Sequence, residues 1–395
     1  MNPSPPEINP AALWQKHHEA WRQPAQATGL WEGAGAAPKA LLQCTVHGHW
    51  WEVLDELGVT LLLTREYEHL LVALGTDAHG PNISYWPMPH PSGMAVDRES
   101  GKVFVACTRN PNQIVEMRPV NGLMPRLDHK QSPPPRGVLI PVASRLYPGC
   151  LYMHDLAFIG QDLYANSVGQ NAIIRLDAQG GQEVTWWPKC VDSSEGPILG
   201  RNHIQLNSIA AGPNLAGSYF SASTDKVTLR RPGHKNFPVD KKGVIFSGAT
   251  REPIAFGLTR PHSTRMHDGR IWVDNSGYGE FGWVEGGTLR PVLTLPGWTR
   301  GLSFCKNIAF VGTSRVIPRF ANYAPGLDVG KSVCAVHAVD LLTGRVLGSI
   351  QWPTGNQIFA IEWLPAQLVQ SLALTVNKQT AASTHNLFYA YRQPS

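Results

Sequence analysis

The stretch Pro261–Gly287, PHSTRMHDGRIWVDNSGYGEFGWVEGG, predicts most of one blade of a β-propeller. Asp268-Gly269 and Gly286-Gly287 are expected to form tight turns, because Asp and Gly tolerate positive φ angles. Short strands are expected on either side of each turn, and Thr288–Leu293 supplies the fourth strand. Four short antiparallel strands in this order are typical of one repeat of a propeller.

The same order of polar start, strand, turn and second strand recurs along the chain. First strands are expected to start near residues 90, 154, 207, 262, 300 and 358. The shortest interval, from 262 to 300, is 38 residues, about the length of one four-stranded blade. The sixth start lacks clear strands downstream, so strands within residues 59–87 are expected to complete its blade. Closing the ring with strands from both ends of the chain removes sheet edges that would otherwise aggregate.

These features predict an all-β fold, a six-bladed β-propeller closed by strands from both termini. The propeller is expected to span residues 50–395 and to follow a short, partly helical and partly ordered arm over residues 1–49. One helix of this arm is expected over Pro10–Arg22. Ser371–Val376 and Leu387–Tyr391 are strand-like runs that leave the register of the closure open. A β-sandwich is the alternative fold, but it does not require the repeated order of elements.

Composition narrows the functional classes. The net charge is +5 without a run of Lys and Arg, so a nucleic-acid-binding surface is not expected. No apolar run approaches the ~20 residues that span a bilayer, and the N-terminus does not resemble a secretory signal. The six cysteines have no CxxC pairing, which is typical of free thiols in a reducing compartment. We therefore expect a cytoplasmic protein that binds neither nucleic acid nor membranes.

A ring of polar residues is expected at one end of the propeller. Alternate turns of an antiparallel blade lie at the same end, so His262, before a first strand, and Asn275, after a second strand, share that end. The first strand of each blade lines the axis. The corresponding ends of all six blades therefore surround a central funnel. The residues expected there are His90, Arg109, His154, Asp155, Asn166, Asn207, Ser223, His262, Asn275, Arg300, Ser314, Arg315 and Glu362, with Arg65 or Tyr67 beside Glu362 and His203 leaning in from a loop.

Three interpretations of this ring remain open from the residues alone. In the first, each polar side chain hydrogen-bonds the backbone of the neighbouring blade and only holds the ring together. In the second, neutral imidazoles hold a divalent metal such as Zn, Ca or Fe near the axis, and an open coordination position activates water. The metal ligands would come from His90, His154, His203 and His262.

The third interpretation is a site without a metal. Arg300, Arg265 and Arg315 would bind an anionic ligand through paired hydrogen bonds, while His154 with Asp155, or His262, performs acid–base chemistry. The predicted catalytic residues are His154, Asp155, His262 and Arg300. The predicted ligand-binding residues are Asn166, Asn207, Arg265, Asn275, Ser314 and Arg315.

Several of these motifs resemble a known family, the bacterial propeller-like proteins grouped as domain of unknown function 4915. The resemblance rests on motifs that occur in the family's order, His154–Ala157, Leu206–Ala210 after His203, Pro261–Ser263, Asn275–Gly277, Thr299–Leu302 and Phe310–Gly312. It covers roughly residues 55–365. The resemblance implies a propeller-like fold and brings no established activity. Similar blade patterns occur in lactonase-like, strictosidine-synthase-like and amidating-lyase-like propellers, whose active sites lie in the axial funnel, but fold alone does not determine function.

The concentration of His, Asp, Asn and Arg at one end predicts an enzyme of the lyase or hydrolase type. Its expected ligand is a small polar or anionic molecule bound in the funnel. The alternative is a non-catalytic propeller that binds a ligand or a partner protein. A partner protein would then contact outer loops such as Asn121–Arg136.

Overall fold

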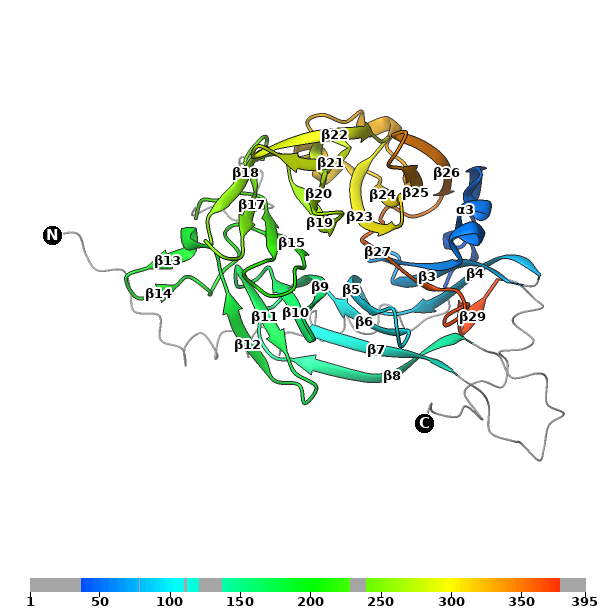
Figure 1. The fold of residues 1–395 in the computed structure, drawn as a ribbon, viewed down its shortest axis with the longest axis horizontal. Coiled ribbons are helices and arrows are strands. Elements are labelled where there is room, and N and C mark those ends of the chain that lie inside the picture. Colours follow the sequence, from blue (N-terminus) through cyan, green and yellow to red (C-terminus); the bar gives the residue numbers. More distant parts are fainter. Residues whose placement is uncertain (1–36, 78, 110–111, 121–136, 228–238, 377–395) are drawn as a thin grey trace.

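The computed structural model describes residues 37–77, 79–109, 112–120, 137–227 and 239–376. The predicted helix Pro10–Arg22, the loop Asn121–Arg136 and the run Leu387–Tyr391 lie outside the described residues. Six sheets surround a common axis, as Figure 1 shows. The predicted six-bladed all-β propeller is therefore confirmed.

The six blades are numbered along the ring, and each is given from the axis outward. Blade 1 contains β27 (Ala360–Pro365), β2 (Val59–Arg65), β3 (Leu70–Asp77), β4 (Gly80–Pro87) and β29 (Leu374–Thr375). Blade 2 contains β5 (Pro91–Asp97), β6 (Lys102–Cys107), β7 (Asn112–Val120), β8 (Val138–Tyr147) and β28 (Ser371–Leu372). Blade 3 contains β9 (Met153–Ile159), β10 (Asp162–Ser167), β11 (Ala172–Leu176) and β12 (Gln182–Trp186).

The remaining blades follow the same pattern. Blade 4 contains β15 (Leu206–Ala210), β16 (Tyr219–Ala222), β17 (Gly243–Ser247) and β18 (Pro253–Leu258). Blade 5 contains β19 (Pro261–His267), β20 (Arg270–Asn275), β21 (Glu280–Glu285) and β22 (Thr288–Thr294). Blade 6 contains β23 (Trp298–Cys305), β24 (Ile308–Ser314), β25 (Cys334–Asp340), β26 (Arg345–Trp352) and β1 (Thr45–Gly48).

The ring closes as predicted, with strands from both ends of the chain. β27 pairs antiparallel with β2, from Val59 opposite Pro365 to Thr64 opposite Ala360. The run Ser371–Val376 does not continue this register but adds two short outer strands, β28 beside β8 and β29 beside β4. β1, within the predicted arm, pairs with β26 at the outer edge of blade 6. These outer strands cover sheet edges that would otherwise be free to pair.

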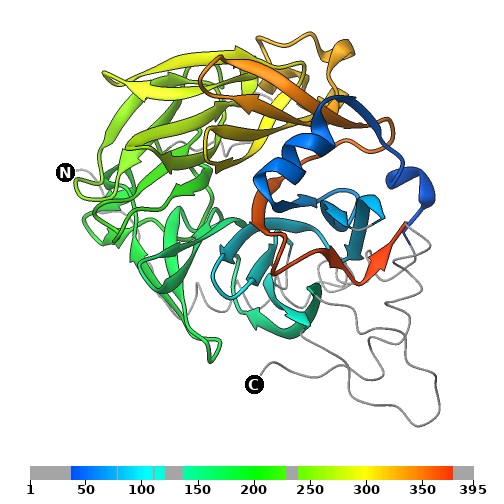
Figure 2. The ribbon, with the colours of Figure 1, turned by 45° about the vertical axis from the view of Figure 1, so that its right-hand side comes forward.

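The helix α3 (Trp50–Leu57) packs against β3 and β26 next to the closure (Figure 2). Gly58 caps the C-terminal end of α3 with φ of 66°, in the left-handed region that glycine adopts without a Cβ clash. Trp50 is fully buried and its ring meets Phe310 edge-to-face, with the centroids 6.1 Å apart. No helix among the described residues is long and apolar enough to cross a bilayer.

The six innermost strands contact one another in sequence around the axis, from β5 through β9, β15, β19 and β23 to β27 and back to β5. The starts of these strands therefore meet at one end of the axis, and their ends meet at the other. A bulge interrupts the pairing near the start of five of them, for example between His262 and Arg265 in β19. Bulges change the direction of side chains and are frequent next to functional sites.

Three elements on the connections between strands bear on the site. The 3-10 segment η4 (Ser276–Tyr278) follows β20, and η5 (Pro318–Tyr323) and η6 (Val329–Lys331) follow β24. The connection between β24 and β25 is long, so it can reach over the axis. It contributes several residues to the cavity described next.

Candidate functional site

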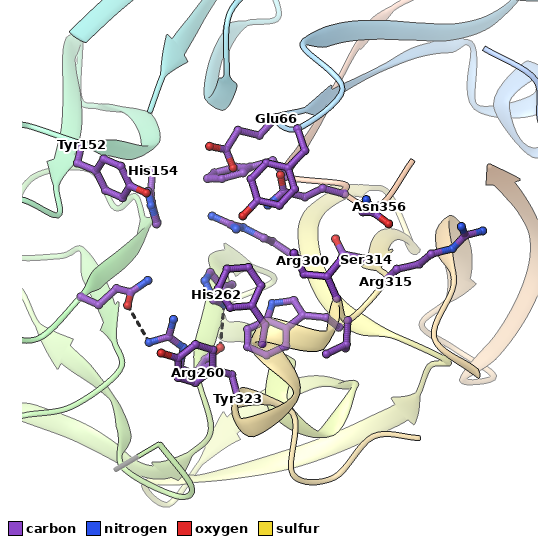
Figure 3. Close-up of a pocket in the computed structure, with 18 of the residues that line it drawn as sticks. Glu66, Tyr152, His154, Arg260, His262, Arg300, Ser314, Arg315, Tyr323 and Asn356 are labelled. Carbon is purple, nitrogen blue, oxygen red and sulfur yellow. Dashed lines mark hydrogen bonds between the residues drawn. The ribbon is translucent and has the colours of Figure 1, made fainter. Parts of the chain in front are cut away.

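A cavity of about 230 Å³ lies on the axis where the innermost strands begin (Figure 3). It is called the funnel below. Six of the residues expected in the ring line it, Tyr67, His154, His262, Arg300, Ser314 and Arg315. The prediction that strand starts and second turns share one end of the blades is therefore correct for these six residues.

Arg300 extends from β23 into the funnel (Figure 3). Its guanidinium carbon lies over the ring of Phe359, 3.3 Å from the centroid. Within the described part of the chain, the Arg300 side chain has no hydrogen-bond partner and no carboxylate within 4.0 Å. Burial lowers its pKa to about 10, so the group stays charged at neutral pH. A charged guanidinium with unused N–H groups is a binding site for an anion.

His262 is held in one tautomer by its neighbours. Its Nδ1 lies 2.8 Å from the carbonyl oxygen of Arg260 and 3.0 Å from Oγ of Ser276. The Ser276 hydroxyl donates to the carbonyl of Thr299, so both neighbours of Nδ1 act as acceptors. We therefore assign the proton to Nδ1, which leaves Nε2 as the acceptor. Burial, followed by the charge of Arg300, lowers the His262 pKa well below 6.5, so the ring is neutral.

His154 lies beside Arg300 and Phe359 in the same funnel (Figure 3). Its ring meets Phe359 edge-to-face at 5.4 Å and Tyr152 at 5.1 Å between centroids. Burial, followed by the charge of Arg300, lowers the His154 pKa well below 6.5. Its Nδ1 is buried without a hydrogen-bond partner among the described residues.

Glu66 is a funnel residue that the sequence analysis did not predict. Its Oε1 accepts a hydrogen bond of 2.6 Å from Thr108 and lies 4.0 Å from Nε of Arg109. Burial raises the pKa of Glu66, but hydrogen bonds from His90 and Thr108 and the charges of Arg109 and Arg300 outweigh this and lower it to about 2. Glu66 is therefore a permanent carboxylate, and the predicted ring residues His90 and Arg109 lie around it.

Arg260, also not predicted, directly precedes β19 and lines the funnel together with His262. Its Nη1 donates to Oε1 of Gln205 at 2.7 Å and to Oγ of Ser223 at 3.2 Å, and its guanidinium lies over the ring of Tyr323 at 4.5 Å. Burial lowers the Arg260 pKa to about 10. Among the described residues, the lining of the funnel thus has three arginines, Arg260, Arg300 and Arg315, against one carboxylate, and both histidines are neutral. The excess of two positive charges favours anions.

The residue that precedes an innermost strand has positive φ in four consecutive blades, although none of the four is glycine. These residues are His90, Tyr152, Gln205 and Arg260, with φ of 44°, 54°, 48° and 55°. The left-handed conformation costs such residues roughly 1–2 kcal/mol each, and strain of this kind gathers at functional sites. Three of the four line the funnel. This shared position within the repeat was the signal that could have identified Tyr152, Gln205 and Arg260 from the sequence.

The three predicted asparagines each hydrogen-bond the backbone of another segment. Asn166 accepts from the amides of His154 and Asp155 and donates to the carbonyl of Leu206 at 2.8 Å. Asn207 donates to the carbonyl of Pro261 at 2.9 Å, which joins blade 4 to blade 5. Asn275 accepts from the amide of Thr259 and donates to Glu280. These contacts are the ones expected from the interpretation in which polar residues hold the ring together.

Asp155 and Arg265 bind each other away from the funnel. Nη1 of Arg265 donates to one carboxylate oxygen of Asp155 at 2.7 Å, and Nη2 donates to the other at 3.1 Å. Arg265, together with Glu362, lines a second cavity of about 360 Å³, which is formed by the later parts of the innermost strands. The structure thus separates Asp155 and Arg265 from the funnel residues with which they were predicted to act.

The four predicted metal ligands are not brought together. The lining of the funnel includes His154 and His262 but neither His90 nor His203. The backbone amide of His203 donates to Oδ1 of Asn171. Within the described ranges, no three His, Cys, Asp or Glu side chains gather in an arrangement that could hold a metal ion.

The sequence model of one family, described as Domain of unknown function (DUF4915), matches residues 48–372. The chain belongs to the DUF4915 family. The resemblance inferred from the blade motifs is thereby confirmed. No curated protein matches this DUF4915 chain.

Three solved structures are similar to the DUF4915 protein at low sequence identity. A chain of the nidogen/laminin complex is 10% identical, with 77% of this chain and 98% of that chain covered and a TM-score of 0.50. A protein of unknown function from Bacteroides caccae is 12% identical, with 77% and 97% covered and a TM-score of 0.44. A gluconolactonase from Xanthomonas campestris is 14% identical, with 75% and 86% covered and a TM-score of 0.44.

Proposed function

We propose that the funnel is the active site of a lyase or hydrolase that acts on a small anionic molecule. The observation that carries the proposal is the Arg300 guanidinium, which is charged, enclosed and without an ion-pair partner among the described residues. Arg300 is partly buried, and a charge held in the protein without an ion-pair partner costs folding free energy. A ligand anion that pairs with it would offset this cost.

The arginines at the opposite end of the axis support this choice of site. Arg265 is paired with Asp155, and Nη2 of Arg98 lies 2.7 Å from Oε2 of Glu362. Their charges are already neutralised inside the protein, so a ligand anion would have to displace an internal partner there. Arg300 requires no such displacement. Anion binding is therefore more favourable in the funnel than in the second cavity.

His262 is suited to act as the general base of the reaction. Its neutral ring has an unprotonated Nε2, and Nδ1–H is oriented by the Arg260 carbonyl. When Nε2 accepts a proton from the substrate, that carbonyl stabilises the imidazolium through the Nδ1–H bond. Arg300 would then stabilise negative charge that develops on the substrate. His154 also lines the funnel as a neutral ring and is the second candidate for proton transfer.

The proposal is tested by incubating the protein with a set of small organic acids and following their consumption by NMR. We expect the wild-type protein to consume at least one acid, and His262→Asn to consume it at least about 100-fold more slowly. Asn retains a donor near the position of Nδ1 but has no counterpart of Nε2. Acids that bind without being consumed would instead support the non-catalytic binding protein. Equal turnover by His262→Asn would remove His262 from the mechanism.

Binding of an anion should raise the pKa of His262. The positive charge of Arg300 is one of the causes that depress this pKa, and a bound anion compensates that charge. Protonation of His262 should therefore occur at higher pH in the complex than in the free protein. NMR titration of the imidazole nitrogens with and without a saturating carboxylate measures the shift. An unchanged or lower pKa in the complex would show that the anion is bound elsewhere.

A further inference from the structure

One wall of the funnel is aromatic, and Arg260 lies over one of its rings, that of Tyr323. We define this wall as Trp298, Phe320 and Tyr323, with Val316 and Ile317 beside them. Phe320 and Tyr323 belong to η5 and lie 5.8 Å apart between ring centroids. A small hydrated ion such as phosphate gains nothing from such a surface. An apolar group on the ligand would displace water from it and gain hydrophobic stabilisation.

We propose that the natural ligand is an aromatic carboxylic acid, or an acid with a similarly flat apolar body, with its carboxylate on Arg300 and its ring against the aromatic wall. This inference rests on the proposed function, because it assigns the substrate class of the same site. Anion binding at Arg300 does not by itself require a ring on the ligand. The present inference does require a ring next to the carboxylate.

The geometry of Arg300 supports a flat acid. Phe359 covers one face of the guanidinium at 3.3 Å, so the N–H groups at its edge are the ones left for the ligand. A carboxylate binds such an edge through two parallel hydrogen bonds in the guanidinium plane. Phe359 also restricts the rotation of Arg300 and thereby pre-orients these donors. A flat body attached directly to the carboxylate continues that plane across the funnel.

The volume of the funnel supports a single ring. Its cavity of about 230 Å³ exceeds the roughly 150 Å³ of an apolar cavity known to hold one benzene molecule. The difference leaves space for a carboxylate on that ring. The charge excess of the funnel also disfavours an aromatic amine, which has the same body but the opposite charge.

The test measures dissociation constants by calorimetry for benzoate, acetate and benzylammonium. We expect benzoate to bind at least 10-fold more tightly than acetate and benzylammonium not to bind detectably. Phe320→Ala should weaken benzoate at least about 5-fold and leave acetate unchanged, and Phe320→Leu is a second variant that preserves more of the packing. Phe256→Ala, at a residue that is 53% exposed on β18, is the matched control and should leave both affinities unchanged.

The outcomes separate this inference from the proposed function. Equal affinities for acetate and benzoate, both weakened by Arg300→Met, would overturn the aromatic class and leave the anion site intact. If Phe320→Ala weakens the binding of acetate and benzoate equally, the aromatic class is likewise overturned and the anion site remains. If Arg300→Met changes neither affinity, the proposed function and this inference both fail.

Discussion

Arg300→Met should weaken the binding of a small carboxylate to the funnel by about 100-fold while leaving the fold at least as stable as the wild type. A charge-assisted hydrogen bond contributes about 1.5–3 kcal/mol, so the loss of the Arg300 donors accounts for this change in affinity. Met is shorter than Arg but keeps an unbranched apolar side chain near Phe359. Removing a cation that has no partner among the described residues removes a cost to folding.

The stability measurement distinguishes an anion-binding role of Arg300 from a purely structural one. A residue that holds the ring together would cause a lower melting temperature when replaced, with no specific effect on anions. The control is Arg98→Met at the other end of the axis, where the guanidinium is paired with Glu362 and stacked 4.5 Å over Trp363. We expect this control to leave carboxylate affinity unchanged and to reduce stability. Calorimetry and thermal unfolding of both variants check the two expectations.

Asp155→Ala should lower the free energy of unfolding by about 3–5 kcal/mol, because it leaves a buried arginine without its partner. The Asp155 carboxylate accepts two hydrogen bonds from Arg265, one from the amide of Ile209 at 2.9 Å and one from the amide of Leu156 at 3.1 Å. These contacts join the innermost strands of blades 3, 4 and 5. The side chains of Asp155 and Arg265 are only 5% and 15% exposed, and the ion-pair contact that Arg265 keeps is a long one, 3.9 Å from Nε to Oε1 of Glu362.

Urea unfolding followed by circular dichroism measures this effect. Asp162→Ala is the matched control, because the Asp162 side chain is 58% exposed and its contact with Arg175 is 3.7 Å, so the change should be within about 1 kcal/mol. The double variant with Asp155→Leu and Arg265→Met should recover much of the loss, since apolar residues can replace a buried ion pair. If Asp155→Ala leaves stability unchanged but abolishes turnover, Asp155 is catalytic as the sequence analysis predicted.

The fold was predictable because each blade repeats one order of strands and turns. The closure of blade 1 by β27 and β2 followed from a first strand near residue 358 that lacked partners downstream. The added outer strands β1, β28 and β29 are two to four residues long. Segments this short have no distinctive pattern in the sequence, and their pairing depends on edges that exist only in the folded blades.

The site was predictable where the position within the repeat decides the placement of a residue. His154, His262 and Arg300 start innermost strands, and all three line the funnel. Asp155, one residue after His154, points elsewhere because successive side chains of a strand alternate in direction. We expected both His154 and Asp155 in the funnel, although neighbouring residues of a strand cannot both point toward the axis.

Other residues of the site depend on information that the repeat does not contain. Glu66 lies in a turn of blade 1, and its role as a carboxylate depends on partners from another blade, such as Thr108. Phe320 and Tyr323 lie on a connection outside the blade pattern. Their packing next to Trp298 brings together segments whose contact no local pattern indicates.

The most direct measurement is a crystal structure of the protein with 4-bromobenzoate, in which anomalous scattering locates the bromine. The account predicts the carboxylate on the edge of the Arg300 guanidinium and the bromine near Phe320, with the His262 and His154 rings facing the ligand. An empty funnel at saturating ligand, or a ligand bound instead beside Arg98 and Arg265 in the second cavity, would contradict the assignment of the funnel as the anion site.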